Sequence, residues 1–170
     1  MIILGIDPGS GGGIAFKDTT TGECKAINMP ETQPDIYNSI KYIAKMGPCK
    51  CYIEKVHAMP GEGVNSVWTF SGNFHGLTMA LYALQVPFTL VTPQTWQKAI
   101  GVKKRPVPKA NKEMSIYEKE SLKKLKYNAK KDHKNNLKEK AQQLFPEQKI
   151  TLKTADALLL VEYGRLEERV

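Results

Sequence analysis

This chain has few cysteines, no long hydrophobic run and no export signal at its start. Cys24, Cys49 and Cys51 are odd in number, and neither a second CxxC-type pair nor a histidine cluster lies near them. We therefore interpret them as free thiols at strand positions, not as a disulfide framework or a zinc site. No apolar stretch is long enough to cross a bilayer, and the first residues lack the pattern of a signal peptide. We expect a cytoplasmic protein that makes no membrane contact.

Acidic residues are outnumbered, and the imbalance is local. The chain has 25 Lys and Arg against 17 Asp and Glu, a net charge of +8. Residues 98–140 hold 15 Lys and Arg against 5 acids, so this segment carries +10 and the other 127 residues together carry −2. One cationic segment on a nearly neutral body is typical of polyanion binding, and the alternative is a solvated helix that only maintains solubility. Lys103, Lys104, Arg105 and Lys109 surround two prolines, so we expect them to project from a loop and contact phosphates.

Hydrophobic periodicity predicts an α/β fold. The length of 170 residues and a hydrophobic content of 41% suit a single domain over residues 1–170. The predicted strands are 2–7, 13–17, 23–28, 51–54 and 88–91, and the predicted helices are 35–46, 64–85, 93–100, 136–145 and 154–168. The lysine-rich region is expected to be partly helical from about Lys112. An antiparallel meander followed by alternating helices and strands predicts a mixed five-stranded sheet flanked by helices.

Three acids lie in apolar sequence. Asp7 ends the apolar run 2–6 and precedes the glycine-rich turn 8–13, Glu54 ends another apolar strand, and Asp156 lies in the first turn of a Leu-rich helix. An ionised carboxylate in such a place is costly unless it is paired, hydrogen-bonded or bound to a cation. Each acid has a simpler explanation, such as an Asx-turn for Asp7 or a helix-dipole partner for Asp156. Together they indicate convergence on a hard divalent cation bound through oxygen.

The order of these motifs resembles a known nuclease family. Gly5–Ser10 (GIDPGS), Ile53–Val56 (IEKV) and Ala155–Leu158 (ADAL) resemble the successive motifs of the RuvC family of Holliday-junction resolvases, within the RNase H-like superfamily. The stretch 53–101, which includes VTPQTW, most resembles the phage-encoded branch. The resemblance covers residues 1–101 and roughly 135–165. GIDPGS alone also resembles the phosphate loops of sugar kinases and actin-like ATPases, whereas the ordered set is specific.

The resemblance implies an RNase H-like fold and a homodimeric endonuclease that cuts phosphodiesters symmetrically at four-way DNA junctions. Asp7, Glu54 and Asp156 would then be ligands of Mg²⁺, for which Mn²⁺ could substitute, and the metal would ready a water for in-line attack. A two-fold dimer would supply one site for each strand to be cut. No nucleotide cofactor is implied, and a phage-encoded protein would act in the cytoplasm of a bacterial host.

Two positions leave alternatives open. The family places a fourth acid or a histidine three residues before the last aspartate, and this chain has Lys153 there. Lys153 could form an ion pair with Asp156 or simply lie in the loop at the helix start. Its ammonium could instead take part in catalysis by holding a phosphate oxygen or by replacing the charge of a second metal. His57 lies near the place of a base-stacking aromatic in the family, so it could contact DNA, or it could be a loop histidine without such a role.

The helix predicted at 64–85 is apolar around most of its circumference. This pattern indicates burial on several sides, in part by a second subunit. We expect Trp68, Phe70 and Phe74 to be core or dimer contacts and not base-stacking platforms, and His75 to be a packing or interface residue.

Three functions from different classes follow from these observations. The first is a metal-dependent junction nuclease, whose cleavage should vanish in EDTA and in Asp7→Asn. The second is a branched-DNA-binding protein whose nuclease activity is impaired or broadened because of Lys153. The third is a sugar-kinase-like or actin-like phosphotransferase, for which 170 residues leave no second domain to close over ATP.

Overall fold

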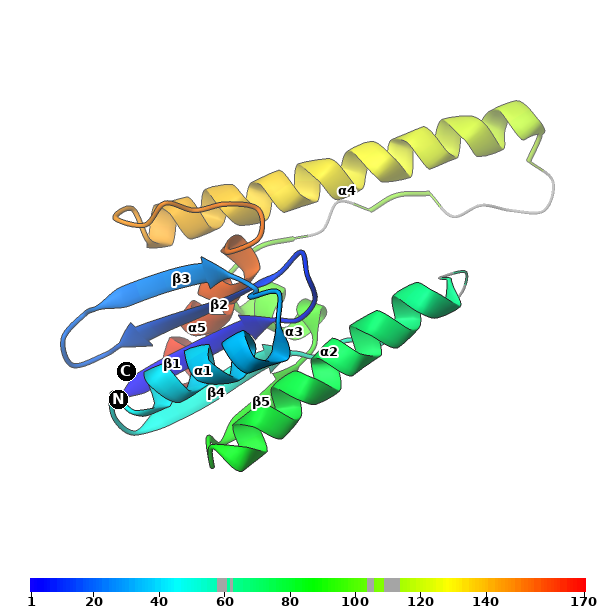
Figure 1. Ribbon diagram of the computed structural model, residues 1–170. Coiled ribbons are helices and arrows are strands. Elements are labelled where there is room, and N and C mark those ends of the chain that lie inside the picture. The colour runs from blue at the N-terminus through cyan, green and yellow to red at the C-terminus, as the bar shows by residue number, and fades with distance from the viewer. Residues whose placement is uncertain (58–60, 62, 104–105, 109–113) are drawn as a thin grey trace.

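A computed structural model describes residues 1–57, 61, 63–103, 106–108 and 114–170. Its elements are, in chain order, β1 (Ile2–Asp7), β2 (Gly13–Asp18), β3 (Cys24–Asn28), α1 (Gln33–Ala44), β4 (Cys49–Glu54), α2 (Val64–Ala83), β5 (Phe88–Val91), α3 (Pro93–Ala99), α4 (Ile116–Leu144) and α5 (Ala155–Glu168) (Figure 1).

The strands form one mixed sheet in the order β3-β2-β1-β4-β5. β1 pairs with β2 and β2 with β3 in antiparallel fashion, which confirms the predicted meander. β4 runs parallel to β1 on its other side, and β5 runs parallel to β4. The predicted five-stranded mixed sheet with flanking helices is therefore confirmed, and β1 lies at its centre.

Each face of the sheet is covered by helices, which gives two hydrophobic cores. The alternation along β1 assigns its side chains to opposite faces, because successive residues of a strand point to opposite sides. Ile2, Leu4 and Ile6 pack in the core that contains α1 and the C-terminal part of α2. Ile3 packs in the other core, with α3, α5 and the C-terminal part of α4. α5 has the most completely buried surface of these helices, from Ala155 to Gly164.

Gly5 allows α5 to lie directly against β1. A Cβ atom at this position would overlap the carbonyl oxygen of Ala157 and would come within 2.8 Å of the backbone nitrogen of Val161. Because no side chain separates them, the backbones of strand and helix are in contact. This contact fixes the position of the first turn of α5 relative to the end of β1.

The lysine-rich region, which we predicted as two separate segments, forms one long helix, α4. We predicted a helix at 136–145 preceded by partly helical structure, but α4 is continuous over 29 residues. Ser115 begins it with a capping box, in which its hydroxyl accepts from the backbone nitrogen of Glu118 at 3.2 Å and its own backbone nitrogen donates to Glu118 at 2.7 Å. The prediction was wrong because neither glycine nor proline occurs between 114 and 145 to interrupt the helix.

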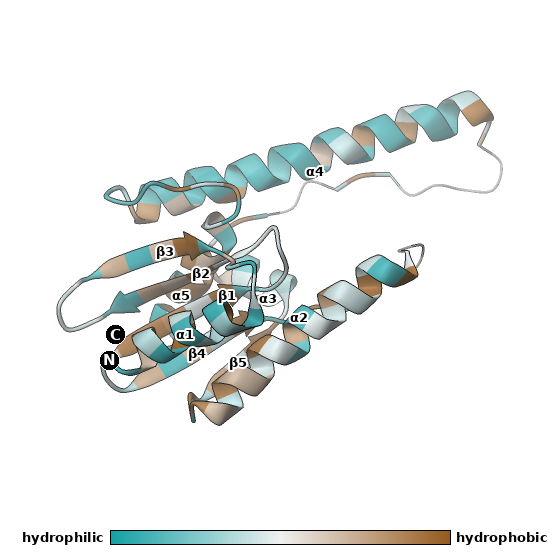
Figure 2. Cartoon of the chain, in the orientation of Figure 1, coloured by the Kyte–Doolittle hydropathy of each residue, from teal (hydrophilic) through white to brown (hydrophobic). Residues whose placement is uncertain are grey.

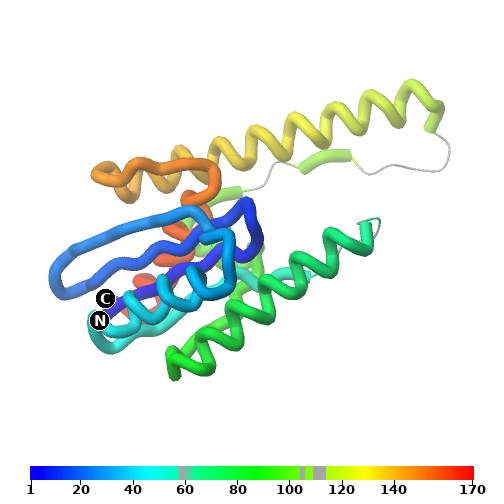
Figure 3. Tube along the Cα trace, viewed as in Figure 1, coloured from blue at the N-terminus to red at the C-terminus, as the bar shows by residue number. Residues whose placement is uncertain are grey.

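Two helices extend beyond the sheet on the side where β1 ends. The N-terminal part of α4 and the N-terminal part of α2 both project past the strands (Figures 1 and 3). α4 is mainly hydrophilic, whereas α2 carries hydrophobic residues along its length (Figure 2). On α2 only Leu77, Ala80 and Leu81 are buried, so the prediction of burial on several sides fails for most of this helix within a single chain.

The prediction of free cysteines can be compared directly with the structure. Cys24, Cys49 and Cys51 lie in strands and are free, as predicted. Burial raises the pKa of the Cys24 thiol to about 11 and that of Cys49 to about 12, so neither is a reactive thiolate at neutral pH. Among the described residues, no helix combines the length and the apolar character needed to cross a bilayer.

Candidate active site

Asp7 and Glu54 end neighbouring parallel strands. Ile6 of β1 is in register with Ile53 of β4, so the next residue on each strand is one of the two acids. Both carboxylates therefore lie at the same edge of the sheet, where parallel strands end together. Each side chain is largely buried and only partly open to solvent.

Asp156 reaches this edge from α5. The turn before the helix is held by hydrogen bonds from the backbone nitrogen of Thr151 to Thr154 Oγ1 at 3.0 Å and from the backbone nitrogen of Thr154 to Thr151 Oγ1 at 3.2 Å. A Cβ atom at Gly13 would lie 2.9 Å from the carbonyl oxygen of Lys153. Because Gly13 is the strand partner of Asp7, the start of α5 lies beside the end of β1.

The three carboxylates share one electrostatic environment. Burial, then repulsion from Asp156 and from Glu54, raises the pKa of Asp7 well above its ordinary value. Burial, together with repulsion from Asp156, raises the pKa of Glu54 to about 7. Burial raises the pKa of Asp156 to about 6. Groups of like charge that are desolvated together favour a bound cation or a proton, and perturbed acids of this kind are frequent at functional sites.

In this structure the three acids are not arranged as a complete set of metal ligands. In residues 1–57, 61, 63–103, 106–108 and 114–170, no three His, Cys, Asp or Glu side chains are grouped closely enough to hold a metal ion as they stand. All three donors are carboxylate oxygens, which is the donor chemistry that Mg²⁺ requires.

Trp96 holds the Glu54 carboxylate and was not identified from the sequence. Its Nε1 donates a hydrogen bond to Glu54 Oε2 at 2.9 Å, and its side chain is 0% exposed. This hydrogen bond lowers the pKa of Glu54 and so partly offsets burial. Thr92 positions the tryptophan by capping α3, since its hydroxyl accepts from the backbone nitrogen of Thr95 at 3.3 Å. A buried Trp N–H needs an acceptor, but the sequence alone does not say which one.

Lys134 of α4 brings positive charge to the same acids. Its charge lowers the pKa of Asp7 and of Asp156, opposing the effect of burial. α4 is joined to α3 nearby, where His133 Nε2 and Gln97 Oε1 are 3.1 Å apart. In the sequence Lys134 is one of many lysines, and only the docking of α4 distinguishes it.

Lys153 lies in the turn before α5 and its side chain is exposed. Its backbone nitrogen donates to Thr151 Oγ1 at 3.2 Å. Among the described residues no ion pair joins it to Asp156. The argument from helical spacing does not apply, because α5 begins two residues later, at Ala155. Of the two structural alternatives, the loop position is the one observed, and a role toward phosphate stays a prediction.

The predicted DNA contacts are only partly within the described residues. Lys103 is exposed just after α3, whereas Lys104, Arg105 and Lys109 lie outside the described residues. His57 is exposed three residues beyond Glu54. It lines a cavity of about 250 Å³ together with Phe70, Phe74 and His75 of α2. A contact of these residues with DNA stays a prediction.

The aromatic residues of α2 divide into two groups. Phe70 and Phe74 are half-buried, and Phe74 contacts His75 edge-on with ring centroids 5.7 Å apart. Trp68 is 81% exposed, so it is not a core residue of this chain.

The fold is similar to that of two solved RuvC structures. The chain matches the structure "T. thermophilus RuvC in complex with Holliday junction substrate" with a TM-score of 0.63 and 11% sequence identity, over 99% of this chain and 95% of that one. It matches a second structure, of Thermus thermophilus RuvC, with a TM-score of 0.54 and 13% identity, over 99% and 96% of the two chains. No protein-family model and no curated protein sequence matches this chain. The likeness establishes an RNase H-like fold, and the relation to a phage-encoded branch stays a prediction.

Proposed function

We propose that this chain is a metal-dependent endonuclease that cuts branched DNA and resolves four-way junctions by symmetric hydrolysis of phosphodiesters. The observation that carries the proposal is the convergence of three largely buried carboxylates, from β1, β4 and α5, on a fold shared with RuvC. A protein that merely displayed acids on its surface would not raise their pKa by burial.

Asp7, Glu54 and Asp156 would hold Mg²⁺, or Mn²⁺ in its place. When bound, the ion supplies activation of a water and stabilisation of the leaving 3′ oxygen. Trp96 orients Glu54 through its N–H group, which limits the rotamers of the carboxylate. Since cation binding requires deprotonated carboxylates, loading of the site would release the protons that the raised pKa values favour.

A basic stripe on α4 supports DNA as the substrate. Lys123, Tyr127, Lys130 and Lys134 recur at intervals of four, three and four residues, so they lie on one side of the helix. All of them are exposed, and Lys134 is the member whose charge acts on the carboxylates. Such a stripe could follow a phosphate backbone toward the acids, with Tyr127 available for contact with sugar or base. We place the DNA contacts of the lysine-rich segment here and at Lys103.

A dimer is supported by the exposed side of α2. Val64, Trp68, His75 and Tyr82 are separated by four, seven and seven residues, the spacing of a coiled-coil seam, and all four are exposed. Exposed fractions of 83% for Val64 and 81% for Trp68 are unusual for apolar residues on one side of a helix. Pairing of this side with a second copy would give two sites related by a two-fold axis, one for each strand of a junction.

The proposal is tested with a synthetic four-way junction and a linear duplex of the same sequence. Purified protein is incubated with each DNA in Mg²⁺, in Mn²⁺ or in EDTA. The wild type should nick the junction at symmetric positions only when a metal is present. Asp7→Asn and Asp156→Asn should lose cleavage by several orders of magnitude while they retain junction binding.

Asp132→Asn is the matched control. Asp132 is an exposed acid of α4, so the same chemical change there should leave cleavage intact. Binding of the junction without cleavage in either metal would favour the branched-DNA-binding alternative. Cleavage that persists in Asp156→Asn, or that requires ATP, would contradict the proposed nuclease.

A further inference from the structure

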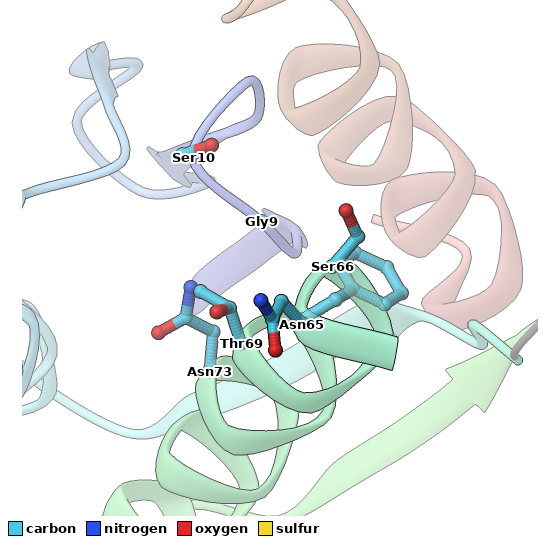
Figure 4. Close-up of a pocket in the computed structure, with 7 residues that line it drawn as sticks. Gly9, Ser10, Asn65, Ser66, Thr69 and Asn73 are labelled. Carbon is cyan, nitrogen blue, oxygen red and sulfur yellow. The ribbon is translucent and has the colours of Figure 1, made fainter. Parts of the chain in front are cut away.

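A groove with several polar side chains lies between the glycine-rich turn, which follows Asp7, and α2. Its volume is about 510 Å³ (Figure 4). The turn contributes Gly9 and Ser10, which follow Asp7 by two and three residues. The facing wall is one side of α2, and its polar residues are Asn65, Ser66, Thr69 and Asn73. We call this space the turn–α2 groove.

The backbone of Gly9 brings the two walls together. Its φ of +99° is in the region that residues with a side chain rarely adopt. A Cβ atom at this position would lie 3.0 Å from Cε2 of the Phe70 ring. A larger residue would therefore both strain the turn and push it away from α2. Glycine at this position therefore allows the turn after β1 to approach α2 closely, and the groove lies between the two.

The groove contains hydrogen-bonding groups without charge. Its polar side chains are hydroxyls and amides, and within the described part of the chain no Lys, Arg, Asp or Glu lines it. One amide is already fixed, since Asn73 Oδ1 accepts from Gln33 Nε2 at 3.2 Å. Ser, Thr and Asn side chains are common partners of phosphate and sugar oxygens in protein–DNA complexes.

The dimensions fit a strand of nucleic acid. From Asn65 to Asn73 the helix rises by about 12 Å at 1.5 Å per residue. One strand of a duplex presents a phosphate about every 3.4 Å along the axis, so this length corresponds to roughly three to four phosphates. The wall formed by the turn begins at Gly9, two residues after Asp7, the last residue of β1.

We propose that the turn–α2 groove binds the sugar–phosphate backbone of the strand to be cut, beside the scissile phosphate, through uncharged hydrogen bonds. This inference rests on the proposed function. Two surfaces would then have separate roles. The lysines of α4 supply affinity through charge, and the groove sets the position of the strand relative to the carboxylates. Asn65 and Thr69 are positioning residues in this arrangement, not members of the acid cluster.

If the two surfaces have these separate roles, substitutions in the groove should lower the affinity for DNA without changing its dependence on salt. The affinity of a labelled four-way junction is measured by fluorescence anisotropy in EDTA over a range of salt concentrations, so that cleavage plays no part. The test variant is Asn65→Ala/Thr69→Val. Both side chains are exposed, so we expect the double variant to fold like the wild type. Affinity should fall about threefold to tenfold for each hydrogen bond lost, with an unchanged slope of log affinity against log salt. Asn38→Ala, an exposed asparagine of α1 outside the groove, is the matched control.

Phosphate scanning locates the contact. Single methylphosphonates are placed along the junction strands, which removes the charge of one phosphate at a time. The wild type should lose affinity at a run of phosphates next to the cut site. In Asn65→Ala/Thr69→Val the interference at that run should disappear while interference elsewhere persists, which is the coupling expected of a direct contact.

Each outcome has a separate meaning. Equal affinity of wild type and double variant, or interference that is the same in both, overturns the groove proposal. Binding of ATP that is lost in the double variant also overturns it, because the groove would then hold a nucleotide. Loss of affinity in the double variant, with no cleavage by the wild type in any metal, upholds the groove as a binding site for the sugar–phosphate backbone and overturns the proposed nuclease. A wild type that binds no DNA overturns both.

Discussion

Glu54→Gln should make the metal-free protein more stable at alkaline pH, at the cost of its function. The pKa of Glu54 is raised from 4.5 to about 7, first by burial and further by repulsion from Asp156. Between these two pH values the carboxyl is ionised in the unfolded chain and protonated in the folded one. The folded state binds more protons, so its free energy of unfolding falls as the pH rises through this window.

The magnitude follows from the size of the shift. At 1.36 kcal/mol per pKa unit, the destabilisation is about 3 kcal/mol above pH 7 and is absent below pH 4.5. Glutamine carries no charge at any pH, and its Oε1 can still accept the hydrogen bond from Trp96 Nε1. The variant should therefore gain most of this free energy at pH 8 and match the wild type near pH 4.

The assay is urea unfolding followed by far-UV circular dichroism in EDTA, between pH 4 and pH 9. Adding Mg²⁺ at pH 8 should stabilise the wild type by about 1.4 kcal/mol at ten times Kd, and should stabilise Glu54→Gln much less. Glu118→Gln is a control of opposite sign. Hydrogen bonds from the backbone and side chain of Ser115 lower the pKa of Glu118, so this variant should lose stability at neutral pH and approach the wild type as the pH falls.

Two results would contradict this expectation: a Glu54→Gln variant that is less stable than the wild type at pH 8, or a difference in stability between the two proteins that does not change with pH. The first result would mean that the carboxylate is a stabilising partner in the metal-free protein. The second would mean that packing, and not charge, controls the effect of the substitution.

Three further variants test individual contacts. Lys134→Gln should raise the pKa of Asp7 and of Asp156, moving the pH profile of metal-dependent cleavage upward, and should reduce the salt slope of DNA binding by about 0.9 if Lys134 contacts one phosphate. Trp96→Phe should raise the pKa of Glu54 and cost about 1 kcal/mol of stability, read from the pH dependence of urea unfolding. Gly5→Ala should cost roughly 1–3 kcal/mol in the same assay, because its Cβ would overlap Ala157, whereas Gly11→Ala, with open space around its Cβ, should cost little.

The sheet was predictable because its signals are local. Successive side chains of a strand point to opposite faces, so Ile2, Leu4 and Ile6 lie on one face of β1 and Ile3 lies on the other. The boundaries of β4 were missed by two residues, since Cys49 and Lys50 belong to the strand. The acids at the ends of the apolar strands could also be recognised in the sequence, because charged residues are rarely buried unless they are paired.

The helices were harder because a helix can be continuous without being buried. α4 was divided in the prediction since its apolar residues become frequent only near its C-terminal end, whereas its capping box and its lack of glycine and proline extend it to Ile116. α2 was predicted to be buried on several sides, in part by a second subunit, whereas within one chain only Leu77, Ala80 and Leu81 are buried. Propensity and capping decide whether a helix forms, and its neighbours decide which side is covered.

Local sequence signals were sufficient to predict the strands, the turns and the carboxylates of the candidate site. These depend on hydrophobic period, on glycine and on the chemistry of carboxylates, all of which act over a few residues. The hydrogen bond from Trp96 to Glu54, and the effect of Lys134 on the pKa values of Asp7 and Asp156, became visible only in the folded chain. Both effects join segments tens of residues apart, and their strength depends on distance and burial, which exist only once the helices have docked on the sheet.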